Sequence, residues 1–194
     1  MKLSMDLACS SSQEWLQTVL SDFDAFLQDH ANCERKASAM ALSFVAKYPN
    51  RVEILPELID IAIEELEHFK QVYELMERRG VQLPEKMGQD PYAKALVDRA
   101  QNGRDGRFLD RLLIASVAEC RGAERFRMVM EGLTDPELKE FYKRLWISEA
   151  KHGHVFVKMA LIYFSEEEVY DRLRYWVAEE AKVIQGLSLR PALH

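Results

Sequence analysis

Apolar residues recur every three or four positions along most of this chain, and runs that alternate polar with apolar positions are nearly absent. The first pattern is typical of helices that bury one face, whereas the second would be typical of strands. Proline, glycine and asparagine residues interrupt the helical pattern at a few places. The pattern predicts helices at about 12–47, 51–79, 91–101, 107–131, 135–164 and 166–185.

Two of the predicted connections are short enough to join antiparallel helices. They lie at residues 48–50, where the sequence is Tyr-Pro-Asn, and at residues 132–136. The segment AQNGRDGR at 100–107 is expected to be an exposed connector between the two hairpins. Two hairpins followed by one more helix predict an all-α four-helix bundle with an additional C-terminal helix. No linker divides the chain, so a single domain is expected over residues 1–194, with its core at about 12–185.

Several charged or ionisable side chains stand in the apolar stripes of these helices. Glu65 and His68 share one helix face with Leu58, Ile61 and Val72, which should be the buried face. A glutamate and a histidine one turn apart are unexpected there, because burial of an ion is costly. The other residues placed in this way are Glu34, Glu119, Glu149 and His152.

Each predicted hairpin thus carries a glutamate on its first helix and Glu-x-x-His on its second. Residues that face each other in a hairpin must lie equally far from its turn. Glu34 and Glu65 both lie 15.5 residues from the centre of the first turn, which is about 23 Å at 1.5 Å per residue. Around the second turn, Glu119 lies at 14.5 residues and Glu149 at 15.5, whereas Glu124 lies at only 9.5. The matching depths favour Glu119 over Glu124 as the facing residue.

Four carboxylates and two imidazoles converging inside a bundle require cations, because unpaired buried ions cost several kcal/mol each. Carboxylate oxygens with one histidine per metal fit iron or manganese better than zinc. Ferritin-like di-iron and di-manganese proteins carry this arrangement of ligands. The sequence therefore predicts a ferritin-like fold with a centre of two iron ions. Its predicted ligands are Glu34, Glu65, His68, Glu119, Glu149 and His152.

Other candidate residues are expected to have lesser roles. His30 precedes Glu34 by one turn and could line the pocket, but it is expected to be partly exposed. His154 is expected near the site or on the surface, and Cys33 and Cys120 are expected to be packing residues. The three cysteines are odd in number and lack C-x-x-C spacing, which argues against a disulfide framework or a rubredoxin-type centre.

Composition limits the function further. The chain is 48% hydrophobic and 30% charged, with a net charge of −6, and no segment has the roughly 20 apolar residues of a membrane span. We expect a cytoplasmic protein without a membrane partner. The acidic charge opposes indiscriminate nucleic-acid binding. A local exception is the segment 99–127, which has seven arginines against four acids; solvated helix charge is the alternative interpretation of this run.

The chain resembles the bacterial tRNA hydroxylase family, whose members hydroxylate the isopentenyl group of methylthio-isopentenyl-adenosine beside the anticodon. The resemblance covers about residues 12–185, and its most specific parts are ERK around Glu34 and AECRGAERF around Glu119. After Glu119 the family usually has Ala-Arg-Ser, whereas this chain has Cys-Arg-Gly. The segments that carry the resemblance are HANCERKASAMALSF, EELEHFKQVYELMERRG, DRLLIASVAECRGAERF and FYKRLWISEAKHGHVFVKMA.

The resemblance implies an O2-dependent di-iron monooxygenase that acts on tRNA and takes electrons from an external ferredoxin-type or reductase-type protein. By position, it implies the same six metal ligands. It also makes the arginine run a candidate for binding tRNA phosphates, with Arg104, Arg107 and Arg121 as the expected contacts. Another ferritin-like di-iron oxidase or an iron-handling protein is the alternative function, and the oligomeric state stays open.

Overall fold

The computed structural model describes residues 3–194, which fall into two compact helical units. The α2–α3 unit comprises residues 18–88 and 190–193, and the α5–α6 unit comprises the remaining described residues. The regular elements in residues 3–194 are seven α-helices and one 3-10 turn, with no strand. This confirms the all-α class. Among the described residues, no helix is long and apolar enough to cross a membrane.

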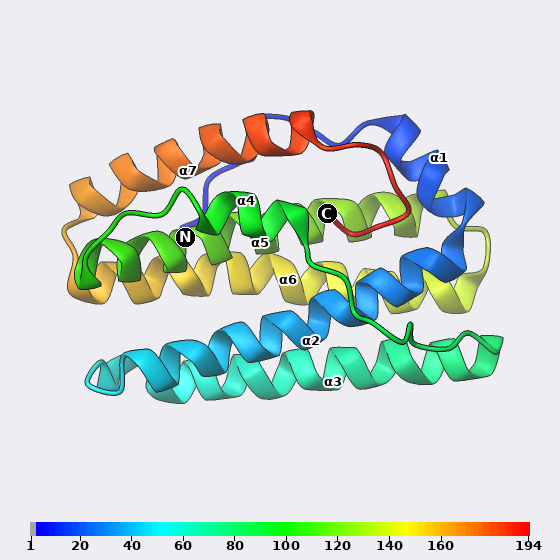
Figure 1. Ribbon diagram of the computed structural model, residues 1–194, viewed down its shortest axis with the longest axis horizontal. Helices are drawn as coiled ribbons and strands as arrows, with labels where there is room; N and C mark the ends of the chain where they lie inside the picture. The colour runs from blue at the N-terminus through cyan, green and yellow to red at the C-terminus, as the bar shows by residue number, and fades with distance from the viewer. Residues whose placement is uncertain (1–2) are drawn as a thin grey trace. The chain divides into compact units, whose positions relative to one another are not determined.

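The α2–α3 unit is a helix hairpin. α2 (Phe23–Lys47) is followed by the 3-10 turn η1 (Val52–Ile54) and by α3 (Leu55–Arg79), and the two helices lie side by side (Figure 1). α3 ends at Gly80, whose φ of 71° is the left-handed conformation that favours glycine at a helix C-terminus. The turn that joins the helices falls where the sequence predicted it.

One long helix was predicted over residues 12–47, and this prediction is wrong. The structure has two helices there, α1 (Gln13–Ser21) and α2, which are separated at Asp22. The Asp22 carboxylate accepts a hydrogen bond of 3.1 Å from the backbone N–H of Ala25. Asp22 therefore acts as the N-cap of α2, and the chain changes direction there although the apolar pattern continues on both sides.

The α5–α6 unit contains a second hairpin and two further helices, α4 and α7. α7 packs against α4, α5 and α6 (Figure 1). Asp135 caps α6 by accepting hydrogen bonds from the N–H groups of Glu137 and Leu138, and Ser165 caps α7 through the N–H of Glu168. These are the N-caps expected of Ser and Asp at helix starts. The bounds are α4 (Pro91–Val97), α5 (Arg104–Gly132), α6 (Pro136–Tyr163) and α7 (Glu166–Gly186).

The expected exposed connector at 100–107 is shorter than predicted. α5 begins at Arg104, directly after Gly103, whose φ is 89°. Arg104 and Arg107 therefore lie on the first turn of a helix, where both side chains are exposed. Glycine at 103 and 106 suggested a loop, but the helix starts immediately after the left-handed residue.

α5 and α6 approach each other closely at Gly153. The Ser116 hydroxyl donates a hydrogen bond of 2.6 Å to the Gly153 carbonyl oxygen. A Cβ added at Gly153 would lie 2.8 Å from the Cys120 Sγ and 3.3 Å from the Ser116 carbonyl oxygen. The hairpin thus has no room for a larger residue at this position, which is next to His152.

We expect Gly153→Ala to destabilise the protein by about 1–3 kcal/mol, because overpacking outweighs the better helix propensity of alanine. The matched control is Gly122→Ala on α5, where an added Cβ meets nothing within 4 Å; it should be neutral or stabilising. Thermal unfolding of both metal-free variants measures the difference. Equal melting temperatures would show that the close approach does not constrain position 153.

Candidate metal centre

The first cluster of predicted ligands lies in the α2–α3 unit. Glu34 comes from α2, and Glu65 and His68 come from α3; each offers a ligand atom, and these atoms lie within 4.8 Å of one another. The His68 Nδ1 lies 3.3 Å from the Glu65 Oε2 and 3.9 Å from the Glu34 Oε2. All three side chains are buried. We refer to these three residues as the α2–α3 half-site.

The second cluster lies in the α5–α6 unit and repeats the arrangement. Glu119 comes from α5, and Glu149 and His152 come from α6, again with ligand atoms within 4.8 Å of one another. The His152 Nδ1 lies 3.5 Å from the Glu149 Oε2. These residues form the α5–α6 half-site. In both half-sites the histidine therefore turns its Nδ1 toward the glutamate one turn earlier.

Each half-site offers two carboxylates and one imidazole from buried positions. Carboxylates this close repel each other, and their burial removes the water that would screen the charge. A divalent cation resolves both problems, and oxygen-rich sites with one imidazole suit iron or manganese. The residues therefore fit a metal, and the buried Glu/His clusters form a candidate metal site. The equal depths of Glu34 and Glu65 along their hairpin agree with the prediction.

His30 differs from the prediction, because it is completely buried rather than partly exposed. Its Nε2 lies 2.6 Å from the Glu34 Oε1. An ionised carboxylate can only accept, so Nε2 carries the proton and donates to Glu34. The residue one turn before Glu119 is Ala115, so the second half-site has no equivalent histidine at this position. His30 holds one carboxylate oxygen of Glu34 and leaves the other, Oε2, facing His68.

Replacing His30 with leucine should weaken metal binding at the α2–α3 half-site by about 10- to 100-fold, the usual effect of losing a group that orients a ligand. His30→Gln, which keeps an N–H donor, should recover part of the affinity. Calorimetric titration with Mn²⁺ measures both variants against the wild type. Identical binding by wild type and His30→Leu would show that the hydrogen bond does not orient Glu34 for a metal.

Arg121 was expected to contact tRNA, but its side chain is completely buried, which contradicts that expectation. Its Nε donates to the Glu180 Oε1 at 2.7 Å and its Nη2 to the Glu180 Oε2 at 2.9 Å. Nη1 donates to Glu124 at 2.7 Å. Tyr92 also donates its hydroxyl to Glu180, at 3.2 Å. Arg121 is therefore part of a buried polar cluster that connects α5, α7 and α4.

The same cluster attaches the N-terminal segment to α5. Ser11 donates its N–H and its hydroxyl to the Glu124 carboxylate at 2.7 and 2.8 Å, and Arg125 lies over the Trp15 ring at 4.3 Å. Burial, together with the nearby charge of Arg121, lowers the pKa of Arg125 to about 10. Burial and the Glu180 carboxylate raise the pKa of Tyr92 well above its usual value. At neutral pH, Arg125 is thus still charged and Tyr92 still carries its proton.

The remaining candidate residues, His154 and the cysteines, make contacts that hold the fold together. The Nδ1 of His154 accepts a hydrogen bond of 3.1 Å from the backbone N–H of Ser4, so His154 fixes the N-terminal segment. Cys33 Sγ lies 3.7 Å from the Asp29 Oδ2, and Cys120 packs close to Gly153. Among the described residues, Cys9, Cys33 and Cys120 form no disulfide.

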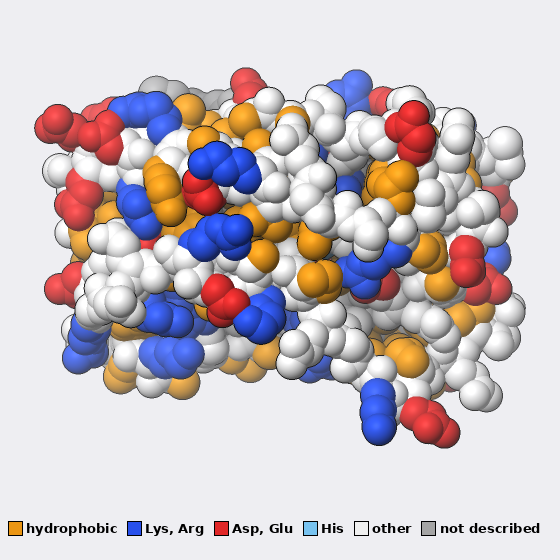
Figure 2. Space-filling view, turned by 45° about the horizontal axis from the view of Figure 1, so that its top comes forward, with side chains coloured by type: hydrophobic (Ala, Val, Ile, Leu, Met, Phe, Trp, Pro, Cys, Tyr) orange, Lys and Arg blue, Asp and Glu red, His pale blue; other side chains and the backbone are white. Residues whose placement is uncertain are grey.

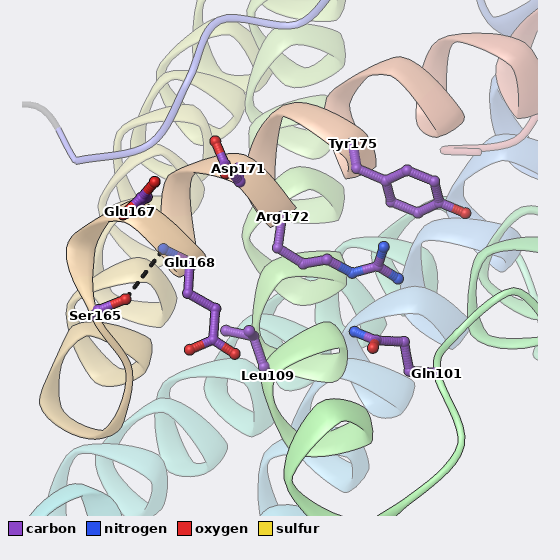
Figure 3. Close-up of a pocket in the computed structure, with 8 residues that line it drawn as sticks. All are labelled: Gln101, Leu109, Ser165, Glu167, Glu168, Asp171, Arg172 and Tyr175. Atoms are coloured by element: carbon purple, nitrogen blue, oxygen red, sulfur yellow. Dashed lines mark hydrogen bonds between the residues drawn. The ribbon is translucent and has the colours of Figure 1, made fainter.

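A pocket of about 540 Å³ opens beside α7 and contains none of the predicted ligands. Figure 3 shows Arg172 and Tyr175 extending from α7 above Gln101 and Leu109. The Arg172 guanidinium holds the buried Asp110 through bonds of 2.5 and 2.9 Å. Although burial alone would raise it, hydrogen bonds from Arg172, Gln101 and Trp176 lower the pKa of Asp110. The arginine in this pocket therefore fastens α7 to α5.

Comparison with known proteins identifies the family of the chain. A family model described as tRNA-(MS[2]IO[6]A)-hydroxylase (MiaE) matches residues 2–194. The chain belongs to the MiaE family. It is 36% identical over 181 residues to the tRNA 2-(methylsulfanyl)-N(6)-isopentenyladenosine(37) hydroxylase of Pseudomonas putida, across 93% of this chain and 87% of that protein. The Salmonella typhimurium protein of the same name is 26% identical over 227 residues, across 92% of this chain and 83% of that protein.

A solved structure extends the comparison to the fold. The chain matches "Protein 43 with aldehyde deformylating oxygenase activity from Synechococcus" with a TM-score of 0.92 and 32% sequence identity, covering 98% of this chain and 96% of that chain. This match confirms the predicted ferritin-like fold class. This chain and the Synechococcus protein thus share one helical framework.

Proposed function

We propose that the two half-sites together hold two iron ions. The six ligands would be Glu34, Glu65, His68, Glu119, Glu149 and His152. The repeated Glu and Glu-x-x-His arrangement supports this proposal, because each hairpin supplies the ligands that one metal of a dinuclear carboxylate centre needs. Membership of the MiaE family supports it independently.

We propose that this chain hydroxylates the isopentenyl group of methylthio-isopentenyl-adenosine next to the anticodon of tRNA. The 36% identity to the Pseudomonas putida hydroxylase across 93% of the chain carries this proposal. A hydroxylase inserts one atom of O2 into a C–H bond and releases the other as water, which takes two electrons from an external donor. A ferredoxin-type or reductase-type protein is the expected donor, and a tRNA substrate implies a cytoplasmic enzyme.

When bound, reduced iron supplies the activation of O2, and the protein supplies geometry and exclusion of water. Glu34, Glu65, Glu119 and Glu149 would hold the metals through their carboxylates, and His68 and His152 would hold them through their imidazoles. His30 holds Glu34 in place by its hydrogen bond. An adenosine turned out of the stacked anticodon loop could bring its prenyl tail to a buried site. Arg104 and Arg107, exposed at the start of α5, are proposed to contact phosphates.

The proposal is tested by incubating the iron-loaded protein with O2, a chemical reductant and tRNA that lacks the hydroxyl group. Digestion to nucleosides should yield a product heavier than methylthio-isopentenyl-adenosine by one oxygen atom, formed as the methylthio-isopentenyl-adenosine is consumed. Absence of this product from a preparation that contains iron would contradict the proposed activity. Storage of many irons per chain would instead favour the iron-handling alternative.

One observation favours a second candidate. The Synechococcus protein with aldehyde deformylating oxygenase activity is 32% identical to this chain and matches it with a TM-score of 0.92. A di-iron oxidase that acts on an aldehyde is therefore the alternative function. Offering an aldehyde in place of tRNA and measuring the one-carbon product separates the candidates, since the tRNA hydroxylase should release none.

A further inference from the structure

The two helices that carry Glu-x-x-His are alike on their buried faces but differ on their exposed faces. On α3, the exposed charged residues are mainly acidic. On α6, the only acid between Phe141 and Tyr163 is the buried Glu149. The exposed charges of this stretch are all basic: Lys143, Arg144, Lys151 and Lys158. We call these four residues the α6 basic face.

The exposed charges of α3 and α6 thus differ mainly in sign, although the protein as a whole has a net charge of −6. Figure 2 shows one face of the molecule, on which Lys and Arg side chains are mixed with Asp and Glu side chains. On α3, the exposed acids include Asp60, Glu64, Glu67, Glu74 and Glu77. A negatively charged partner would be repelled there and attracted to the α6 basic face.

The α6 basic face is also regularly spaced. Arg144, Lys151 and Lys158 follow one another at intervals of seven residues, so they repeat every two helical turns, about 10.5 Å apart. Ile147, 44% exposed, lies among them, and the neighbouring Trp146 ring lies 5.3 Å from the Arg127 guanidinium. A straight row of cations with apolar surface between them suits an extended polyanion with sugars and bases beside its phosphates.

The row leads toward the arginines at the start of α5. The Phe108 and Tyr163 rings lie 5.7 Å apart, so the first turns of α5 lie beside the last turn of α6. Lys158 is one and a half turns before Tyr163, and Arg104 and Arg107 are on the first turn of α5. Lys158, the last cation of the row, therefore lies toward the same end of the hairpin as Arg104 and Arg107.

We propose that the α6 basic face binds the phosphate backbone of the tRNA substrate. This inference rests on the proposed function, and it adds the surface on which the tRNA lies. The length of the α6 basic face and the regular spacing of its cations favour tRNA over an acidic electron-transfer protein as the partner. Phosphates recur at regular intervals along a nucleic-acid strand, whereas the acidic side chains of a protein surface have no such repeat. Phosphate contacts of this kind position the nucleic acid without reading its sequence.

The experiment compares two triple variants of the full-length protein. The first, Arg144→Gln/Lys151→Gln/Lys158→Gln, neutralises the three regularly spaced cations of the α6 basic face and leaves Lys143, which lies 3.7 Å from Glu140. The matched control is Lys70→Gln/Lys94→Gln/Lys182→Gln, which removes the same charge from exposed positions on α3, α4 and α7. Binding of tRNA that lacks only the hydroxyl group is measured at several salt concentrations, with thermal unfolding and iron content as checks on folding.

The first variant should bind tRNA on the order of 10- to 100-fold more weakly at low salt, and the slope of log affinity against log salt should fall by about 2 to 3. The control should bind as the wild type does. An unchanged slope in the first variant overturns the inference, whereas failure of the wild type itself to bind or hydroxylate tRNA would overturn the proposed function. Normal tRNA binding combined with slower reduction by an electron-transfer protein would assign the face to that protein instead.

Discussion

Glu65→Ala is expected to abolish hydroxylation and to remove metal from the α2–α3 half-site. Glu65 is completely buried and lies 3.3 Å from His68 through its Oε2, so alanine removes a proposed ligand and leaves a cavity in its place. Loss of a group that merely orients a ligand costs 10- to 100-fold in metal affinity or activity, and loss of the ligand itself should cost at least about 100-fold.

The loss of metal binding in Glu65→Ala should also be measurable as a loss of metal-dependent thermal stability, without any catalytic turnover. Metal that binds the folded state at about 100 times its Kd stabilises it by about 2.7 kcal/mol, which is a rise of about 5–10 °C in Tm for a chain of this size. Mn²⁺ should produce this rise in the wild type and much less of it in Glu65→Ala. Glu67→Ala is the matched control, because Glu67 lies on the same helix with an exposed side chain. A full Mn²⁺-dependent rise in Glu65→Ala would show that Glu65 is not a ligand.

Glu180→Ala is expected to destabilise the protein by about 3–5 kcal/mol, because it removes the completely buried carboxylate that pairs with Arg121 and leaves the guanidinium with only the partly exposed Glu124. The Arg121 and Glu180 side chains are completely buried, and two hydrogen bonds of 2.7 and 2.9 Å join them. Tyr92 would lose its acceptor as well. Chemical denaturation measures the loss, and Glu167→Ala on the exposed side of α7 should change the free energy of unfolding by less than about 0.5 kcal/mol.

A double variant identifies the cause of this loss. Arg121→Met combined with Glu180→Leu removes both charges and should recover much of the stability, as apolar replacement of buried ion pairs often does. A double variant as unstable as Glu180→Ala would mean that packing, rather than the uncompensated charge of Arg121, controls the loss.

The hairpins and the convergence of the candidate ligands could be predicted from the sequence because both depend on local rules. Proline and glycine stop the helices, and a period of 3.6 residues decides which side chains share a face. Glu34 and Glu65 were paired by counting from a turn, and their ligand atoms lie within 4.8 Å. The distance of each residue from the turn is enough to pair them, because antiparallel helices with a short connection have little freedom to slide along each other.

The roles of Arg121 and His30 could not be derived in this way. Arg121 depends on Glu180, a partner 59 residues away on a different helix, so its own neighbours suggested only a solvated or RNA-binding charge. A signal was nevertheless present: Glu180 stands in the apolar stripe of α7, between Val177 and Val183, as Glu34 does in α2. A buried acid that is not needed for the metal site requires a buried cation, and Arg121 is that cation.

Helix ends were the other source of error. The break at Asp22 has apolar periodicity on both sides, so only the capping carboxylate distinguishes it from an uninterrupted helix. At the start of α5, two glycines suggested a longer loop than the structure has. Both errors arise because a single capping residue or a single left-handed residue decides where a helix begins. The apolar periodicity of the sequence extends over many residues and does not reveal the effect of one.

The most direct test of the proposed function is the origin of the oxygen atom in the modified nucleoside. The iron-loaded protein, a reductant and tRNA that lacks the hydroxyl group are incubated under isotopically labelled oxygen gas in ordinary water, and the digested nucleosides are weighed by mass spectrometry. The proposed function predicts that one labelled oxygen atom appears in the hydroxylated methylthio-isopentenyl-adenosine, and that Glu65→Ala forms none. Unlabelled hydroxyl derived from water, or label incorporation that persists in Glu65→Ala, would contradict it.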